Sequence, residues 1–172
     1  TGGTGTEGVT TVRVSDGANV ASVISGFDAQ VSQELVDTAS QVTYTLTDAA
    51  TNAADTLNLK VDGGTANQTV TAANIETVLI SAENGVSSVG AYTFVNATNV
   101  TIDADTDFTT AALSTAAIES LAVTGDSDVT ITAFNGNTAT PALRTVTLGE
   151  TASLTIGDAL NAAVTDVTST SS

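Results

Sequence analysis

A short phrase recurs along the chain at intervals of 21 to 25 residues, and this repeat constrains the fold more than any other feature. It reads IETVLI from Ile75, IESLAV from Ile118 and LRTVTL from Leu143, with looser copies from Asp55 and Thr98. A repeat of this length is typical of solenoids, in which each coil buries its apolar face against the next coil. The central apolar positions follow steps of 21, 22, 21 and 25 residues: Leu57, Val78, Val100, Leu121 and Val146.

Each coil is predicted to hold at least two strands. The apolar run 121–123 is followed by a second run at 129–131, and 146–148 is followed by 154–156, with a turn between the runs each time. The predicted fold is therefore all-β, a parallel β-helix or β-solenoid with coils of about 21–25 residues. The alternative is a β-sandwich, which also contains short Val- and Thr-rich strands at regular spacing. The solenoid is favoured because the phrase keeps its register from copy to copy.

The chain divides into two predicted parts. Residues 1–50 are expected to form an N-terminal linker and capping segment, and residues 51–172 the solenoid repeats. Residues 30–39 carry apolar side chains at helical spacing and predict a helix. No charged-then-apolar leader follows Thr1, so we expect a processed chain or a part of a longer one.

The charge of the chain excludes several partners. It carries 19 acidic residues against 3 Lys and Arg, a formal net charge of −16. Nucleic-acid binding needs a basic surface, and anionic membrane surfaces also require positive charge. No apolar run approaches the roughly 18 residues of a membrane-spanning helix, so no membrane insertion is expected. A divalent cation is the partner that such a chain favours.

Catalysis is not expected from these residue types. The chain has no His and no Cys, which excludes a Ser-His-Asp triad, a Cys-His pair and a His- or thiolate-bound metal. Glu76 and Glu119 occupy matching positions and resemble the carboxylate pair of a glycosidase. Matching positions in a repeat are better interpreted as structural corner residues. We expect no enzymatic activity.

The candidate metal ligands are carboxylates at predicted turns. Asp103, Asp105 and Asp107 alternate directly after an apolar strand and could converge on one hard cation, with Asp126 and Asp128 as weaker candidates. Ca²⁺ takes six to eight oxygen ligands and accepts loop geometry, so Ca²⁺ is the hypothesised ion. The alternative is a solvated acidic turn, because the Gly and Glu of an EF-hand loop are missing.

Residues 52–160 resemble bacterial surface-layer proteins, in particular the RTX-related kind that Gram-negative bacteria export by the type I route. The resemblance lies in the Ala-, Thr-, Val-, Gly- and Asp-rich composition, the lack of Cys, and the phrases that begin at Ile75 and Ile118. It implies a secreted, extracellular β-solenoid that self-assembles into a lattice or filament on the cell surface, often with Ca²⁺ between subunits. The glycine-rich nonapeptide repeat of that kind is missing, since Thr6 stands where Asp is required.

The expected function is therefore structural. An end coil without a cap leaves unpaired strand edges, and a head-to-tail contact that does not close produces filaments or sheets. The main expected partner is a further copy of the chain. The alternative is an adhesin stalk or a carbohydrate-binding module of a larger secreted protein, with a cell-surface polysaccharide as the partner.

Overall fold

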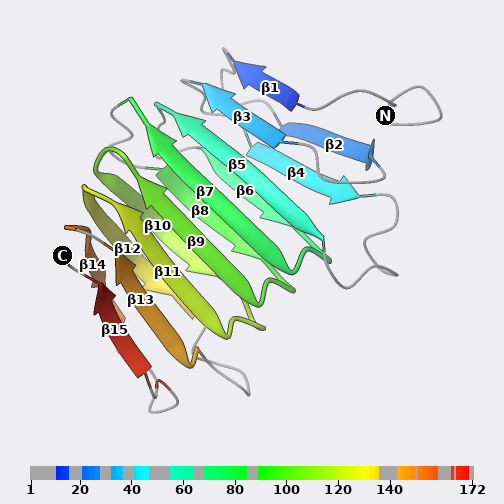
Figure 1. Cartoon of the computed structure of the whole chain (residues 1–172). Coiled ribbons are helices and arrows are strands. Elements are labelled where there is room, and N and C mark those ends of the chain that lie inside the picture. Colours follow the sequence, from blue (N-terminus) through cyan, green and yellow to red (C-terminus); the bar gives the residue numbers. More distant parts are fainter. Residues whose placement is uncertain are drawn as a thin grey trace.

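The computed structural model describes residues 11–15, 21–27, 32–36, 41–46, 55–63, 68–84, 89–135, 143–149, 151–158, 164 and 166–170. These residues form fifteen strands (Figure 1). Among them, no helix is long and apolar enough to cross a membrane. The strands are β1 (Thr11–Ser15), β2 (Ala21–Phe27), β3 (Ser32–Val36), β4 (Gln41–Leu46), β5 (Thr56–Asp62), β6 (Thr69–Ala72), β7 (Thr77–Glu83), β8 (Val89–Phe94), β9 (Asn99–Ala104), β10 (Phe108–Ser114), β11 (Ser120–Gly125), β12 (Asp128–Phe134), β13 (Thr145–Gly149), β14 (Ser153–Ile156) and β15 (Asp166–Thr170).

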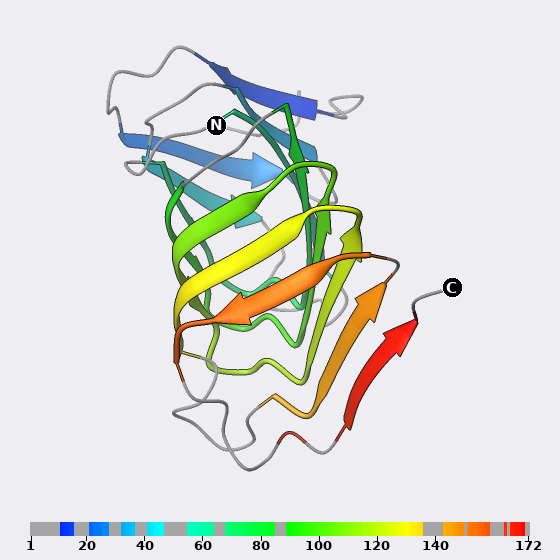
Figure 2. The ribbon, with the colours of Figure 1, turned by 90° about the vertical axis from the view of Figure 1, so that its left-hand side faces the viewer.

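The strands alternate between two sheets. The odd-numbered strands form an eight-stranded sheet in chain order, here called the odd sheet, and the even-numbered strands form a seven-stranded even sheet. All neighbouring strands are parallel. Figure 2 shows the chain passing from one sheet to the other and returning one strand further along. The predicted β-solenoid is confirmed, and the β-sandwich alternative is wrong because a sandwich has antiparallel sheets.

The register of the odd sheet follows the sequence repeat. The central apolar positions Leu57, Val78, Val100, Leu121 and Val146 are successive register partners, and all are buried. In the even sheet, Val129 pairs with Leu154 and Ile131 pairs with Ile156. The prediction of two strands in each coil is therefore confirmed.

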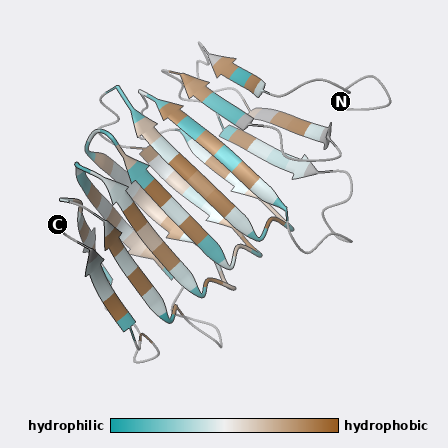
Figure 3. Cartoon of the chain, in the orientation of Figure 1, coloured by the Kyte–Doolittle hydropathy of each residue, from teal (hydrophilic) through white to brown (hydrophobic). Residues whose placement is uncertain are grey.

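Alternation along the strands places the core between the two sheets. Every second residue of β5 and β7 is buried, as the period of a strand requires. Figure 3 shows hydrophobic and hydrophilic residues alternating along β5. Buried aromatic side chains from the even sheet contribute to this core: Tyr44, Tyr92, Phe94, Phe108 and Phe134. The Tyr92 ring lies 6.2 Å from Phe94 and 6.1 Å from Phe108, measured between ring centroids. These contacts fall within the range of favourable aromatic pairs.

The recurring phrase marks the corner at which the chain enters the odd sheet. A buried apolar side chain directly precedes the corner residues Glu76, Thr98, Glu119 and Arg144: Ile75, Ala97, Ile118 and Leu143. At the corner, the carbonyl oxygens of Asp55, Glu76, Thr98 and Glu119 each accept two backbone N–H groups from the following coil, at N···O distances of 2.8–3.2 Å. The Glu76 carboxylate also accepts the Asp55 N–H at 3.0 Å. Glu76 and Glu119 are thus corner residues that join successive coils.

The helix predicted for residues 30–39 is wrong, because Ser32–Val36 forms strand β3. A spacing of four residues fits one face of a strand as well as one face of a helix, so the pattern was ambiguous. The pairing of this segment with β1 and β5 explains why it forms a strand and not a helix. Leu35 faces the core beside its register partner Val61 and is fully buried. Its apolar side chain is therefore removed from water although no helix forms.

The predicted division at residue 50 does not appear in the sheets. Strands β1 to β4 precede it, yet they pair with one another and with β5 and β6 in the same two parallel sheets. The described part of residues 1–50 therefore contributes coils to the solenoid. The first ten residues of the predicted linker and capping segment lie outside the described residues.

A buried hydrogen bond crosses from one coil to the next in the even sheet. The Tyr92 hydroxyl donates to Gln68 Oε1 at 2.5 Å, and both residues are fully buried. Burial raises the pKa of Tyr92 above its ordinary value of 10.0, because the phenolate would lose its hydration. The unfolded chain can ionise this phenol above pH 10, whereas the folded chain keeps it neutral. The contribution of Tyr92 to the free energy of unfolding is therefore fully present below pH 10, and it decreases as the pH rises above 10.

Tyr92→Phe is expected to lower the free energy of unfolding near neutral pH by about 1–2 kcal/mol, because a buried hydrogen bond is lost. The same variant should lose less further stability than the wild type between pH 10 and 11. Urea denaturation at pH 8, 10 and 11 measures both effects. An equal loss above pH 10 in the two proteins would contradict the assignment of alkaline sensitivity to Tyr92.

Candidate functional site

The predicted metal ligands lie at one edge of two successive coils. Asp105 and Asp107 occupy the turn after β9, Asp126 occupies the equivalent turn after β11, and Asp128 begins β12. The backbone N–H of Asp105 donates to Ala82 O at 3.1 Å, and that of Asp126 donates to Ala104 O at 3.2 Å, which shows the equivalence. We call this group, together with Asp103, the acidic corner.

The carboxylates of the acidic corner tie one coil to the next. Asp103 Oδ1 accepts the Thr124 hydroxyl at 2.7 Å, and Asp107 Oδ1 accepts the Asp128 N–H at 3.2 Å. Asp128 Oδ1 in turn accepts the Ser153 hydroxyl at 2.6 Å. Asp103 belongs to strand β9, while Asp105 and Asp107 belong to the turn. Within the described ranges, no three acidic side chains form a group that could hold a metal ion. The calcium site stays a prediction.

Electrostatic repulsion acts along this edge. Equivalent residues in neighbouring coils of a parallel sheet are separated by about 4.8 Å, which is shorter than the screening length of about 8 Å at physiological salt. Asp105 therefore repels Asp126, and Asp107 repels Asp128. Cations near this edge would relieve the repulsion.

Within the described residues, the solenoid is open at the β15 end. Three interior-facing residues of the last coils are only partly buried: Leu148, Leu154 and Ile156. Their register partners Val123, Val129 and Ile131 are completely buried. Val167 on β15 is 64% exposed. A hollow of about 250 Å³ lies there, lined by Val146, Leu148, Leu154, Ile156, Asp158 and Val167. Among the described strands, none pairs with the outer edge of β14 or β15. In the described part of the chain, the odd sheet also extends one strand beyond the even sheet at this end.

The opposite end presents the edges of β1 and β2. Val12 and Val14 of β1 pack against the core but are only partly buried. Both ends of the described solenoid therefore present strand edges beside apolar side chains.

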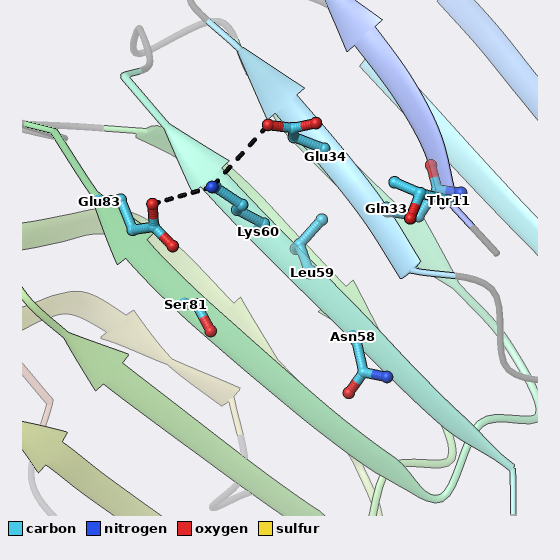
Figure 4. A pocket seen from close by; sticks show the side chains of 8 residues that line it. All are labelled: Thr11, Gln33, Glu34, Asn58, Leu59, Lys60, Ser81 and Glu83. Carbon is cyan, nitrogen blue, oxygen red and sulfur yellow. Dashed lines mark ion pairs between the residues drawn. The ribbon is translucent and has the colours of Figure 1, made fainter.

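A second hollow, of about 350 Å³, lies on the odd sheet near the β1 end (Figure 4). We call it the Lys60 hollow. It is lined by residues of β1, β3, β5 and β7: Thr11, Gln33, Glu34, Asn58, Leu59, Lys60, Ser81 and Glu83. The hollow was not predicted from the sequence.

Ion pairs organise the charged side of the Lys60 hollow. Lys60 Nζ lies 2.9 Å from Glu83 Oε2 and 3.9 Å from Glu34 Oε1. Arg13 Nε lies 3.6 Å from the other oxygen of Glu34. The hydrogen bond to Glu83 raises the pKa of Lys60, and the nearby charges of Glu83 and Glu34 add to this effect. Two of the three cationic residues of the chain are therefore gathered here, each beside a carboxylate.

Gln33 borders this hollow, but its side chain lies on the inner face of β3, in register with Leu59. It is 1% exposed, and neither its side-chain oxygen nor its side-chain nitrogen has a hydrogen-bond partner. Its register partner in β5 is Leu59, an apolar core residue. Gln33 is therefore a polar residue in the apolar interior row, on the opposite face of the sheet from Asn58 and Lys60.

Comparisons of the chain with protein families, with curated proteins and with solved structures found no match.

Proposed function

We propose that this chain is a non-enzymatic structural protein that assembles end to end with copies of itself into an extracellular filament or lattice on the bacterial cell surface. The observation that carries the proposal is the open end at β14 and β15, where strand edges and apolar core residues lie side by side. The sequence resemblance to secreted surface-layer proteins supports the extracellular location.

The two ends of the solenoid are suited to each other. An unpaired parallel edge can accept another parallel strand, and β1 of a second copy would continue the odd sheet beyond β15. Val12 and Val14 would then extend the apolar interior over Val167. This contact joins different surfaces of the two copies, so it does not close and can repeat into a filament.

Calcium is proposed to promote this assembly. Copies that each carry a formal charge of −16 repel one another, and the acidic corner concentrates part of that charge. Divalent cations would reduce the repulsion by binding between carboxylates of neighbouring coils. Extracellular calcium modules bind with dissociation constants of about 10⁻⁴–10⁻³ M, and we expect the same range here.

A proline at the free edge of β15 tests the proposed contact. The Asp166 N–H donates to Arg144 O on the β13 side, at 3.2 Å, so by alternation the Ser169 N–H points away from β13. Ser169→Pro removes that outward donor and leaves the existing ladder in place. The variant should remain folded but require a concentration at least roughly tenfold higher to polymerise, since 1.4 kcal/mol of contact energy corresponds to a factor of ten.

Ser169→Ala is the matched control, because it removes only the hydroxyl and keeps the backbone N–H. Sedimentation of both variants against the wild type, with circular dichroism to verify folding, measures the effect. If Ser169→Pro polymerises as readily as Ser169→Ala, the β15 edge is not the contact.

The open end also fits a second function, a stalk segment of a larger adhesin. In that case, further coils of the same polypeptide would cover β14 and β15. A chain that stays monomeric at every concentration and calcium level would favour the stalk over the self-assembling protein.

A further inference from the structure

We propose that the outer face of the even sheet is a second contact surface between copies of the chain, on which two solenoids pack side by side as a twofold dimer. This contact goes beyond the end-to-end contact at β15 and does not depend on it, because it uses a different surface. All fifteen described strands belong to the two sheets, so none of them covers the outer face of the even sheet.

A row of short side chains crosses this face from β2 to β10. Its five members are successive register partners, and each lies next to a buried core residue in its own strand, which places it on the outer side of the sheet. We call this row and the surface around it the threonine face. The members of the row are Val23, Thr43, Thr71, Thr93 and Ser114.

The positions beside this row carry equally short side chains. Ala91 pairs with Ala112, and Thr130 pairs with both Thr109 and Thr155. At one end of the row, Val23 is 69% exposed, which is a large apolar surface to leave in water. A second copy packed on the threonine face would cover it.

The threonine face carries almost none of the charge of the chain. In the seven described even strands, Asp128 at the start of β12 is the only charged residue. The face is therefore nearly uncharged in a chain with a formal net charge of −16. The eight odd strands instead contain seven charged residues: Arg13, Glu34, Lys60, Asp62, Glu83, Asp103 and Asp166.

This charge distribution favours a second copy of the chain as the occupant. Two copies repel each other when their carboxylates approach within the screening length, about 8 Å at physiological salt. Stacked sheets lie about 10 Å apart, so the carboxylates of the odd sheet are largely screened from a partner on the threonine face. Contact through the odd sheet or through the acidic corner would instead bring carboxylates of both copies together.

The threonine face is also complementary to itself. The strands of both copies repeat at the same spacing of about 4.8 Å, so the side-chain rows of one copy fit the rows of the other. Short side chains of this kind interdigitate in dry contacts between sheets. Each threonine hydroxyl both donates and accepts hydrogen bonds, so facing hydroxyls satisfy one another when water is excluded.

The size of the face suits a weak, specific dimer. Seven strands of four to seven residues present about 600 Å² on each copy, or about 1,200 Å² for the pair. This area is at the lower limit for specific protein interfaces, which is about 1,200 Å². Because short side chains each contribute little contact energy, we expect a dissociation constant of roughly 10–100 μM.

Analytical ultracentrifugation of the Ser169→Pro chain in EDTA tests the inference, since these conditions remove both the end-to-end contact and calcium. We expect a monomer–dimer equilibrium that does not proceed to larger species, because a twofold contact is closed. The dimer should be tighter in about 1 M NaCl than in about 0.15 M NaCl, because the screening length falls to about 3 Å and the general repulsion of the two copies decreases.

Thr71→Lys in the same background distinguishes this face from every other surface. The substitution lowers the net negative charge, so it would strengthen an association through another surface. On the threonine face it buries a lysine near the lysine of the partner, and the dissociation constant should increase roughly tenfold or more. Thr93→Lys, on the neighbouring strand, is a second variant of the same kind. Thr101→Lys is the matched control, because Thr101 lies on the outer side of β9 in the odd sheet.

Three results would overturn the inference. The first is a monomer at every concentration up to roughly 500 μM in 1 M NaCl, far above the expected dissociation constant. The second is a dimer that neither Thr71→Lys nor Thr93→Lys weakens. The third is an equal loss of the dimer in Thr101→Lys. Circular dichroism verifies that each variant is folded.

The side-by-side contact and the end-to-end contact can fail separately. If the end-to-end contact is wrong, calcium-dependent filaments are absent but the Ser169→Pro chain still forms dimers. If the side-by-side contact is wrong, this chain is monomeric although the wild type still forms filaments in calcium.

Discussion

Leu121→Asn should lower the free energy of unfolding by about 3–6 kcal/mol and leave the chain largely unfolded at 37 °C. Leu121 is completely buried at the centre of the apolar row that joins Val100 and Val146. Truncating a buried leucine costs about 2–5 kcal/mol, and an unpaired buried amide adds about 1–3 kcal/mol. Because each coil contacts only its neighbours, a defect here separates the stack into two shorter parts.

The neighbouring residue provides the control. Ala122 follows Leu121 in the same strand but faces outwards and is only partly buried. Ala122→Asn should change the free energy of unfolding by less than about 1 kcal/mol, as surface substitutions generally do. Urea denaturation followed by circular dichroism compares the two variants. Similar losses in both would mean that the inward and outward faces of β11 are wrongly assigned.

Gly125→Ala is expected to cost about 3–5 kcal/mol, far more than a methyl group usually does. Gly125 has a φ of 88°, a region that L-residues rarely adopt. An added Cβ would stand 2.3 Å from Ala104 O, a backbone atom that cannot move aside alone. The same oxygen accepts the N–H groups of Asp126 and Ser127 at 3.2 Å, so both hydrogen bonds would be disturbed. Left-handed strain costs about 1–2 kcal/mol and overpacking about 1–3 kcal/mol.

Gly149→Ala separates this effect from the general cost of losing a glycine. At Gly149 an added Cβ would have its nearest neighbour, Thr124 Cγ2, at 3.5 Å, which is ordinary contact. This variant should unfold within about 0.5 kcal/mol of the wild type. Differential scanning calorimetry of both variants provides the comparison. If Gly125→Ala melts together with Gly149→Ala, the turn after β11 does not have the strained conformation described above.

The sequence repeat predicted the register of the solenoid from Leu57 to Val146 residue by residue. This was possible because a coil that slips by one residue would turn its apolar side chains outwards. The position of Glu76 and Glu119 at corners was also predictable, since the corner carbonyls must be satisfied in every coil. The first coils were harder to predict, because Gln33 stands where the repeat requires an apolar residue.

The candidate sites depended on features that the repeat does not encode. Alternate spacing alone does not determine whether the carboxylates of Asp103, Asp105 and Asp107 converge. Their convergence depends on the directions of the side chains at the end of the strand. The Lys60 hollow joins Gln33, Lys60 and Glu83, which are far apart in sequence. Only the pairing of β3 with β5 and of β5 with β7 brings them together.

The proposal of end-to-end assembly is tested most directly by the size of the particles that the purified chain forms. Light scattering and negative-stain electron microscopy should be performed over a range of protein concentrations, with about 5 mM CaCl₂ and then with EDTA, which covers the extracellular calcium range. We predict ordered filaments or sheets whose length increases with protein concentration and with calcium, and which shorten in EDTA. Monomers at every concentration, with and without calcium, would contradict the proposal.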